Sequence, residues 1–253
     1  MAKIVSFSNQ KGGVGKTTSC VNIGAQIANK GKKVLIIDMD PQGNATSGLG
    51  IAKSKVKKTI YDVIIGQATI NEAIIKTKFK NLSVISSNID LAGAELELHE
   101  LEDGVDYAKV ALESIKADYD YIFIDCPPSL GMLTVKALSL SDGIVIPMQC
   151  EFFSLEGMSQ LLNTVKRIKQ LYNPDLQIVG ILLTMYNGRL TLTGQVVAEL
   201  KKYYADKLFK VPISRTVRIS EAPGYGEPIC YHDPYGKGAL EYAAVAKELM
   251  MRI

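Results

Sequence analysis

Hydrophobic and polar positions follow two different patterns along the chain. Short β-branched apolar runs predict strands, and longer stretches with an apolar residue every three or four positions predict helices. Between Leu155 and Tyr172, for example, apolar side chains recur at helical spacing. The predicted strands cover residues 4–8, 33–38, 82–86, 121–125, 143–148, 178–184 and 208–212, and the predicted helices cover 17–30, 154–172, 192–204 and 239–251, with further helical material from residue 87 to about residue 117.

The order of these elements predicts the fold class. The strands are apolar without interruption, so both faces of their sheet are expected to be covered by helices. Strands that alternate with helices indicate an α/β protein with a doubly wound, mostly parallel sheet. The chain has no internal repeat and no low-complexity linker, so residues 1–253 are predicted to form a single domain. Residues 43–80, with many Lys, Gly and Thr, are predicted to be a surface excursion.

Composition narrows the class of protein only slightly. The 47% hydrophobic and 22% charged residues are those of an ordinary globular protein, and a net charge of +3 neither indicates nor excludes nucleic acid. The four cysteines lie too far apart in the chain for zinc or iron–sulfur spacing. The chain also lacks a signal-peptide pattern and an apolar run of roughly 18 residues. A reduced, cytoplasmic protein is therefore predicted.

The segment between the first predicted strand and the first predicted helix carries the most specific signal. Residues 9–18 read Asn-Gln-Lys-Gly-Gly-Val-Gly-Lys-Thr-Thr. Glycines allow backbone N–H groups to surround phosphate oxygens, and the positive end of the following helix dipole faces the same anion. Lys16 would reach the β- and γ-phosphates, and the Thr17 hydroxyl would bind Mg²⁺. The predicted phosphate-binding residues are Gly12, Gly13, Val14, Gly15, Lys16, Thr17 and Thr18.

The base is predicted to be adenine. Guanine-reading phosphate-loop proteins use Asn/Thr-Lys-x-Asp, and the two similar stretches, at residues 29–32 and 77–80, lack the aspartate. Three acidic residues, Asp38, Asp40 and Asp125, lie at or just beyond predicted strand ends, where parallel sheets bind ligands. The sequence thus predicts an ATP site at that edge of the sheet.

The loop departs from the ordinary Walker A pattern, because Gln10 stands where its first glycine belongs and Lys11 precedes the glycines. Lys11–Thr17 resembles the deviant Walker A motif of the ParA/MinD ATPases, and the chain is most similar to the short, Soj-like chromosomal ParA proteins. The resemblance implies a P-loop NTPase fold and Mg²⁺-dependent hydrolysis of ATP to ADP and phosphate. It covers essentially the whole chain and includes Asp38–Asn44, Asp125–Ser129, Thr184-Met185 with Arg189, and Arg218–Pro223.

The resemblance also implies roles for individual residues. Lys11 would reach across a dimer to the nucleotide of the other subunit and neutralise transition-state charge, as an arginine finger does. Asp40 would position the attacking water, Asp38 would support the metal region and Asp125 would hold Mg²⁺ through water. The catalytic residues are thus predicted as Lys11, Lys16 and Asp40, and the metal-site residues as Thr17, Asp38 and Asp125. The alternative is a structural role, in which the carboxylates accept local backbone hydrogen bonds.

The family usually has Pro-Arg-Asn-Val-Arg where this chain has Ser214-Arg215-Thr216-Val217-Arg218. The resemblance therefore implies adenine contacts at Ser214 and Thr216. Arg189 and Arg218 match positions through which Soj-like proteins bind DNA without sequence preference, and Arg215 and Lys237 are further candidates. Such contacts go to phosphates and depend strongly on salt. The alternative is scattered surface charge.

The leading hypothesis is a DNA-partition ATPase. ATP would drive formation of a homodimer that binds double-stranded DNA non-specifically, and a ParB-type partner would stimulate hydrolysis and release. The protein would then be nucleoid-associated in its ATP-bound state. One alternative is a MinD-like, membrane-associated positioning ATPase, which is disfavoured because the last apolar pattern, at 239–253, looks like a helix packed on the body with no basic amphipathic tail after it. Another is an iron–sulfur reductase like the nitrogenase iron protein, for which Cys126 and Cys150 are the only candidate ligands.

Overall fold

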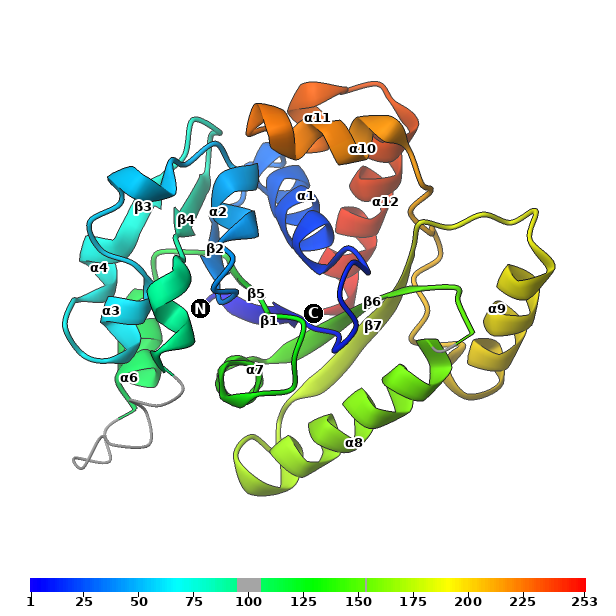
Figure 1. Cartoon of the computed structure of the whole chain (residues 1–253), viewed down its shortest axis with the longest axis horizontal. Helices are drawn as coiled ribbons and strands as arrows, with labels where there is room; N and C mark the ends of the chain where they lie inside the picture. Colours follow the sequence, from blue (N-terminus) through cyan, green and yellow to red (C-terminus); the bar gives the residue numbers. More distant parts are fainter. Residues whose placement is uncertain (95–105, 153) are drawn as a thin grey trace.

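The computed structural model describes residues 1–94, 106–152 and 154–253. A seven-stranded sheet runs through the molecule in the order β3-β4-β2-β5-β1-β6-β7 (Figure 1). All neighbouring strands are parallel except β3 and β4, which are antiparallel. The strands are β1 (Lys3–Phe7), β2 (Val34–Asp38), β3 (Ile74–Lys76), β4 (Leu82–Ile85), β5 (Tyr121–Asp125), β6 (Gly143–Gln149) and β7 (Gln177–Thr184).

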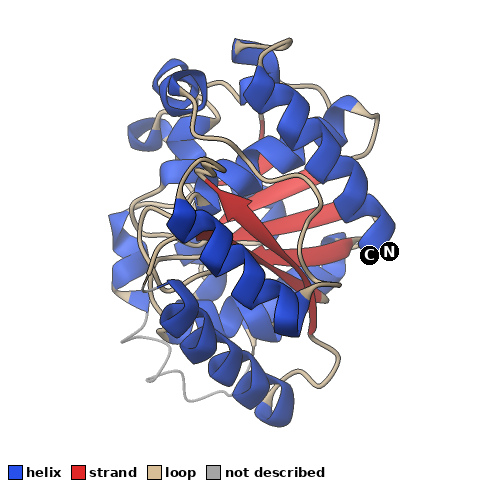
Figure 2. Cartoon of the chain, turned by 90° about the vertical axis from the view of Figure 1, so that its right-hand side faces the viewer, coloured by secondary structure: helices blue, strands red, loops and turns tan. Residues whose placement is uncertain are grey.

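Helices cover both faces of this sheet, as Figure 2 shows. The longer ones are α1 (Lys16–Asn29), α6 (Tyr107–Ile115), α7 (Met132–Ser139), α8 (Ser154–Leu171), α9 (Thr191–Tyr204) and α12 (Lys237–Arg252). The shorter ones are α2 (Asn44–Gly48), α3 (Ile60–Ile64), α4 (Ile70–Ala73), α10 (Val217–Glu221) and α11 (Ile229–His232), with 3-10 turns η1 (Lys53–Lys55), η2 (Ile89–Ala92) and η3 (Ala222–Tyr225). This arrangement confirms the predicted doubly wound α/β fold.

Successive side chains of the central strands point to opposite faces of the sheet and pack into two separate core clusters. Phe123 packs into the cluster formed with α1 and α12, whereas its neighbours Ile122 and Ile124 pack with α3, α4, α6 and α7. A third cluster joins β6 and β7 to α8 and α9. Because each strand is buried on both faces, it reads as a continuous apolar run rather than an alternating one.

Strand register brings the predicted acidic residues together. β5 pairs with β1 on one side and with β2 on the other, and the last pairs are Phe7 with Asp125 and Asp38 with Asp125. The carboxyl ends of the three central strands are therefore level with one another. The loops that follow them share one edge of the sheet, where open parallel sheets bind ligands.

Two expectations about the peripheral segments were wrong. Much of the segment 43–80 is not a surface excursion, because Ile60, Val63, Ile64 and Ile70 are buried in the core. Two capping boxes, in which a threonine and an acidic residue cap the same helix end, start α3 and α4. The antiparallel strand β3 in this segment, and the short helices α7, α10 and α11, were also missed.

The predicted strand at 208–212 is a single bridge between Leu208 and Ile181. Pro212 lacks a backbone donor, and the guanidinium of Arg252 donates to the carbonyl oxygens of Lys207 and Leu208, at 2.9 and 2.6 Å. The segment still follows β7 through backbone hydrogen bonds, from the Phe209 N–H to the Ile181 carbonyl oxygen at 3.0 Å and from the Ile213 N–H to the Leu183 carbonyl oxygen at 2.8 Å, but it does not form a regular strand. The helical material expected up to residue 117 is present as α6, and its remainder at 95–105 lies outside the described residues.

Candidate nucleotide-binding site

The loop between β1 and α1 has the backbone shape of an anion-binding loop. Gly13 and Gly15 adopt φ values of 73° and 84°, in the left-handed region that favours glycine. Gly15 is also the N-cap of α1, so the free N–H groups of the first helical turn follow the loop directly. A chain that curls in this way at a helix N-terminus attracts phosphate.

Side chains from the neighbouring strand ends hold this loop in place. The Thr184 hydroxyl, at the end of β7, donates to the Val14 carbonyl oxygen at 2.7 Å. The Gln149 amide, at the end of β6, donates to the Gly13 carbonyl oxygen at 2.8 Å. The Asn9 amide donates to the Pro147 carbonyl oxygen at 2.8 Å. Sequence reasoning missed Gln149 and Asn9 as loop supports, because their partners lie about 140 residues away.

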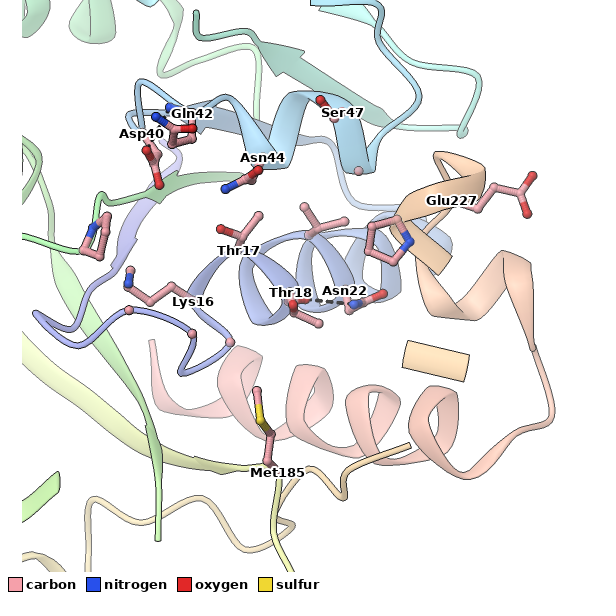
Figure 3. Close-up of a pocket in the computed structure, with 17 residues that line it drawn as sticks. Lys16, Thr17, Thr18, Asn22, Asp40, Gln42, Asn44, Ser47, Met185 and Glu227 are labelled. Atoms are coloured by element: carbon pink, nitrogen blue, oxygen red, sulfur yellow. Dashed lines mark hydrogen bonds between the residues drawn. The ribbon is translucent and has the colours of Figure 1, made fainter. Parts of the chain in front are cut away.

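The loop opens into a cavity of about 470 Å³. The first two turns of α1 form one wall, and the segment from Asp40 through α2 forms the opposite wall (Figure 3). A cavity of this size suits a small molecule such as a nucleotide. Of the predicted phosphate-binding residues, Gly12, Gly13, Gly15, Lys16, Thr17 and Thr18 line it, and Val14 is buried behind them.

Lys16 is the cation of the cavity. Its side chain is buried, and its ammonium donates to the Lys11 carbonyl oxygen at 3.2 Å. Burial lowers the pKa of Lys16, while the nearby Asp125 and Asp40 oppose that shift. A partly desolvated ammonium interacts strongly with any anion that enters the cavity, because little water screens it.

Asp38 and Asp125 lie side by side at the ends of β2 and β5. The Asp38 carboxylate accepts hydrogen bonds from the Thr46 backbone N–H at 2.8 Å and the Thr46 hydroxyl at 2.7 Å. Burial raises its pKa to about 6. Asp125 is also fully buried, and neither of its oxygens meets the geometry of a hydrogen bond with the described residues, although the Thr17 hydroxyl lies close enough to oppose the rise in the Asp125 pKa. Burial, and next the charge of Asp38, raise the pKa of Asp125.

These residues fit a magnesium–nucleotide complex. A buried carboxylate without a partner, such as Asp125, carries an unfavourable free energy that a cation or its bound water would relieve. No group of three His, Cys, Asp or Glu side chains within the described ranges could hold a metal alone. Magnesium rarely needs such a group, since it usually takes one or two protein ligands together with phosphates and water. Asp125 and Thr17 therefore suit the predicted metal side of the cavity.

Asp40 lies on the cavity wall opposite Lys16 (Figure 3). Its carboxylate accepts a hydrogen bond from the Gln42 backbone N–H at 2.9 Å, and its own N–H donates to Asp38 at 3.3 Å. These bonds satisfy local backbone groups, which is the structural role left open from the sequence. The carboxylate nevertheless faces the cavity.

Lys11 does not line the cavity of its own chain. Its side chain is 37% exposed, and its ammonium forms an ion pair with Glu151 in the loop between β6 and α8. The Lys11 backbone N–H donates to the Asn9 side-chain oxygen at 3.1 Å, which fixes the start of the loop. The reach of Lys11 to a second subunit stays a prediction.

The two predicted adenine contacts lie outside the cavity lining. Ser214 bonds to Glu241 through its backbone N–H at 2.8 Å and its hydroxyl at 2.7 Å. Thr216 caps α10 by accepting from the Ile219 N–H. The part of the cavity away from the loop is lined instead by Asn22, Ser47, Pro223 and Glu227. Of these, only Pro223 belongs to a motif that the sequence singled out.

The predicted DNA contacts are exposed side chains. Arg189 lies in the loop before α9, and that loop runs beside the chain near Arg215 through a bridge between Tyr186 and Ser214. Arg218 in α10 is 65% exposed and pairs with Glu221 at 3.3 Å. Lys237, at the start of α12, is 70% exposed and lies 3.7 Å from Glu241. The fold thus brings the segments of Arg189 and Arg215 together and leaves all four cations accessible.

A glycine-rich loop between a central parallel strand and a helix, with a buried lysine and aspartates from adjacent strand ends, defines a P-loop nucleoside triphosphatase. A family model described as an AAA domain matches residues 2–178. The sporulation initiation inhibitor protein Soj of Bacillus subtilis is 53% identical over 249 residues, which cover 98% of each chain. The chromosome partitioning protein ParA of Myxococcus xanthus is 45% identical over 252 residues, 100% of this chain and 89% of the relative.

Among solved structures, cobyrinic acid a,c-diamide synthase from Mycobacterium smegmatis with bound ADP and magnesium has a TM-score of 0.85 and 34% identity. The match covers 98% of this chain and 93% of that one. The chain belongs to the AAA-domain family matched above and, within it, to the Soj- and ParA-like members of the ParA/MinD ATPases. It is an ATPase that uses ATP and Mg²⁺, as predicted. No helix in the described part of the chain is long and apolar enough to cross a membrane.

Proposed function

We propose that this protein is a DNA-partition ATPase whose ATP-bound form is a sandwich dimer. The dimer binds double-stranded DNA without sequence preference, and a ParB-type partner stimulates hydrolysis and so releases the DNA. Relatives that cover nearly the whole chain carry the names Soj and chromosome partitioning protein ParA, which supports this function. The observation that carries the dimer is Lys11, a cation next to the phosphate loop that does not line its own cavity.

The charged side chains around the phosphate loop each have a proposed task. Lys16 binds the β- and γ-phosphates, and the amides of the loop surround them. Thr17 and Asp125 would hold the magnesium ion, which supplies positive charge against the phosphates when bound. Asp38, fixed by Thr46, keeps the end of β2 and the segment leading to Asp40 in position.

Asp40 is proposed to orient the attacking water. Phosphoryl transfer needs little covalent help, so positioning and charge neutralisation carry most of the catalysis. The Asp40 carboxylate is held by the Gln42 backbone N–H and faces the cavity across from Lys16. Lys11 from the second subunit would complete the site. To do so it must leave Glu151, a pair that is exposed and therefore weak, on the order of 1 kcal/mol or less.

DNA binding is assigned to Arg189 and Arg218, with Arg215 and Lys237 beside them. The ion pairs of Arg218 and Lys237 are exposed and contribute little stability, so phosphate oxygens can replace their carboxylate partners. Contacts of this kind carry no sequence information and weaken steeply with salt.

The test is DNA retention and size-exclusion chromatography with and without ATP. We expect a monomer without nucleotide, a dimer with ATP, and ATP-dependent retention of unrelated DNA duplexes. The Arg189→Glu, Arg218→Glu double variant should still dimerise but lose DNA affinity by more than about tenfold at moderate salt. If this variant binds DNA as well as the wild type, the assignment of this surface is wrong, and a wild type that binds no DNA overturns the proposed function.

A further inference from the structure

The positive charge of the protein is concentrated in one segment. Residues 51–80 contain seven lysines against Asp62 and Glu72, a net charge of +5. The remaining residues contain 22 Lys and Arg against 24 Asp and Glu, a net charge of −2. A small net charge for the whole chain therefore hides a strongly basic region, and none of the residues assigned above to DNA or ATP lies in it.

The two acidic residues of this segment are already used in local structure. Asp62 accepts from the Thr59 N–H at 2.9 Å and pairs with Lys58 at 3.0 Å. Glu72 accepts from the Thr69 N–H at 2.8 Å and from its hydroxyl at 2.7 Å. Lys55, Lys57, Lys76 and Lys80 are exposed, and none of these four lysines forms an ion pair with the part of the chain that the structure describes. These four residues are called the lysine surface.

The lysine surface includes one side of a groove. Lys55 and Lys57 of this surface, together with the paired Lys58, line a groove of about 490 Å³ between the loop after η1 and the edge strand β3, and Glu72 is its single acidic residue. Lysine on an edge strand can simply prevent pairing with another sheet, which would account for Lys76. That explanation does not extend to Lys55 and Lys57, which lie in η1 and the loop after it rather than on the strand.

We propose that the lysine surface is a second binding surface for the phosphate backbone of DNA; the inference rests on the proposed function for its choice of polyanion. The absence of apolar anchors favours DNA over a protein or a membrane. Within residues 51–80, all of which the structure describes, no large hydrophobic side chain is exposed. Protein interfaces and amphipathic membrane surfaces need such side chains, whereas the duplex backbone requires only positive charge.

Two contacts join the flanks of this surface to the cavity walls. The Lys53 ammonium donates to the Gln42 carbonyl oxygen at 2.7 Å, and the Gln42 N–H in turn holds Asp40. On the other side, Lys78 pairs at 2.9 Å with Glu227, which lines the cavity just after η3. α10, which carries Arg218, directly precedes η3, so Lys78 links the segment 51–80 to the part of the chain that follows Arg218.

The experiment compares two charge-matched double variants in ATP-dependent DNA binding across a salt series. Lys55→Gln with Lys57→Gln removes two charges from the lysine surface. Lys166→Gln with Arg167→Gln removes two exposed charges from α8, which lies on another part of the molecule (Figure 1). We expect the first variant to lose about tenfold in affinity and to reduce the slope of log affinity against log salt by about two. The α8 variant should stay within about twofold of the wild type, because a residue remote from the duplex loses no phosphate contact.

Since all four substituted side chains are exposed, both variants should keep the melting temperature and the DNA-free ATPase rate of the wild type. Unchanged affinity and salt slope in the first variant overturn the inference, and so does an equal loss in the α8 variant, which would mean a non-local charge effect. If Arg189→Glu with Arg218→Glu abolishes DNA binding while the first variant retains it, the proposed function stands and only the lysine surface fails. Sedimentation with vesicles of phosphatidylcholine and phosphatidylglycerol tests the membrane alternative. If Lys55→Gln with Lys57→Gln weakens vesicle binding but leaves DNA binding unchanged, the assignment of the lysine surface to DNA is wrong.

Discussion

The charged side chains of Lys16 and Asp40, which line the nucleotide cavity, and of Asp38 and Asp125, at the neighbouring strand ends, are buried. The arginines and lysines assigned to DNA are exposed. Coulomb interactions in the cavity are weakly screened, so each group strongly changes the free energy of its neighbours. On the surfaces, water and salt screen each charge, and single contacts contribute about 1 kcal/mol or less. The cavity is therefore expected to fail when one residue changes, while the surfaces should weaken stepwise.

The largest effect is expected for Lys16→Ala. Removing the buried ammonium leaves Asp125 and Asp40 without their nearby positive charge and deprives the phosphates of theirs. We expect ATP affinity to fall by about a thousandfold, measured by calorimetric titration, which corresponds to roughly 4 kcal/mol. Lys30→Ala, an exposed lysine just after the same helix, should bind ATP normally. Near-normal affinity in Lys16→Ala would contradict the contrast between the cavity and the surfaces.

The next largest effect concerns catalysis rather than binding. Asp40→Ala removes a carboxylate that faces the cavity but leaves the phosphate loop intact. ATP affinity should change by less than about threefold, while the hydrolysis rate falls by about a hundredfold or more because the water loses its positioning group. Chromatography with ATP should then show a persistent dimer. Normal turnover in this variant would mean that Asp40 only satisfies local N–H groups.

A third expected effect is a pH dependence that buried carboxylates produce and exposed ones do not. The pKa of Asp38 is raised from 3.8 to about 6 in the folded chain, so the folded protein holds this proton more tightly than the unfolded chain does. Its contribution to stability is thus fully present below about pH 4 and is lost as pH rises through about 6.

The loss amounts to roughly 3 kcal/mol at 1.36 kcal/mol per pKa unit. It is measured by denaturant unfolding of the nucleotide-free protein in a chelator. Asp38→Asn should flatten the decline between about pH 4 and 6, because the amide has no proton to lose. An equally steep decline in the variant would assign the effect to another group, and Asp175→Asn, an exposed aspartate, serves as the control.

The smallest effect is expected for a neutral hydrogen bond that supports the cavity. Thr184→Val removes the hydroxyl that holds the Val14 carbonyl oxygen and keeps the size of the side chain. A hydrogen bond of this kind contributes about 1 kcal/mol, so ATP should bind roughly fivefold more weakly. Thr164→Val is the matched control, since its hydroxyl bonds only to the carbonyl of Gln160 in its own helix. If Thr184→Val lowers ATP affinity as much as Lys16→Ala does, the hydrogen bond to the loop matters as much as the buried positive charge.

The sequence by itself determined the central strands, the phosphate loop, its lysine and the aspartates at strand ends. These features are local: glycines set the loop, apolar runs mark strands buried on both faces, and a polar residue ends each run. The motif also singled out Lys11, which the structure places outside the lining of its own cavity. What failed were weaker local signals, such as the strand expected at 208–212.

Only the tertiary structure decided which distant residues meet. The register that sets Asp38 beside Asp125, the supports from Gln149 and Thr184, and the cavity wall at Asn22 and Glu227 all join segments far apart in the chain. The buried helices of the segment 43–80 and the exposed lysines between them likewise depend on which face the fold covers. A single sequence cannot predict such contacts, because packing against other elements, rather than local preference, determines whether a side chain is buried or free.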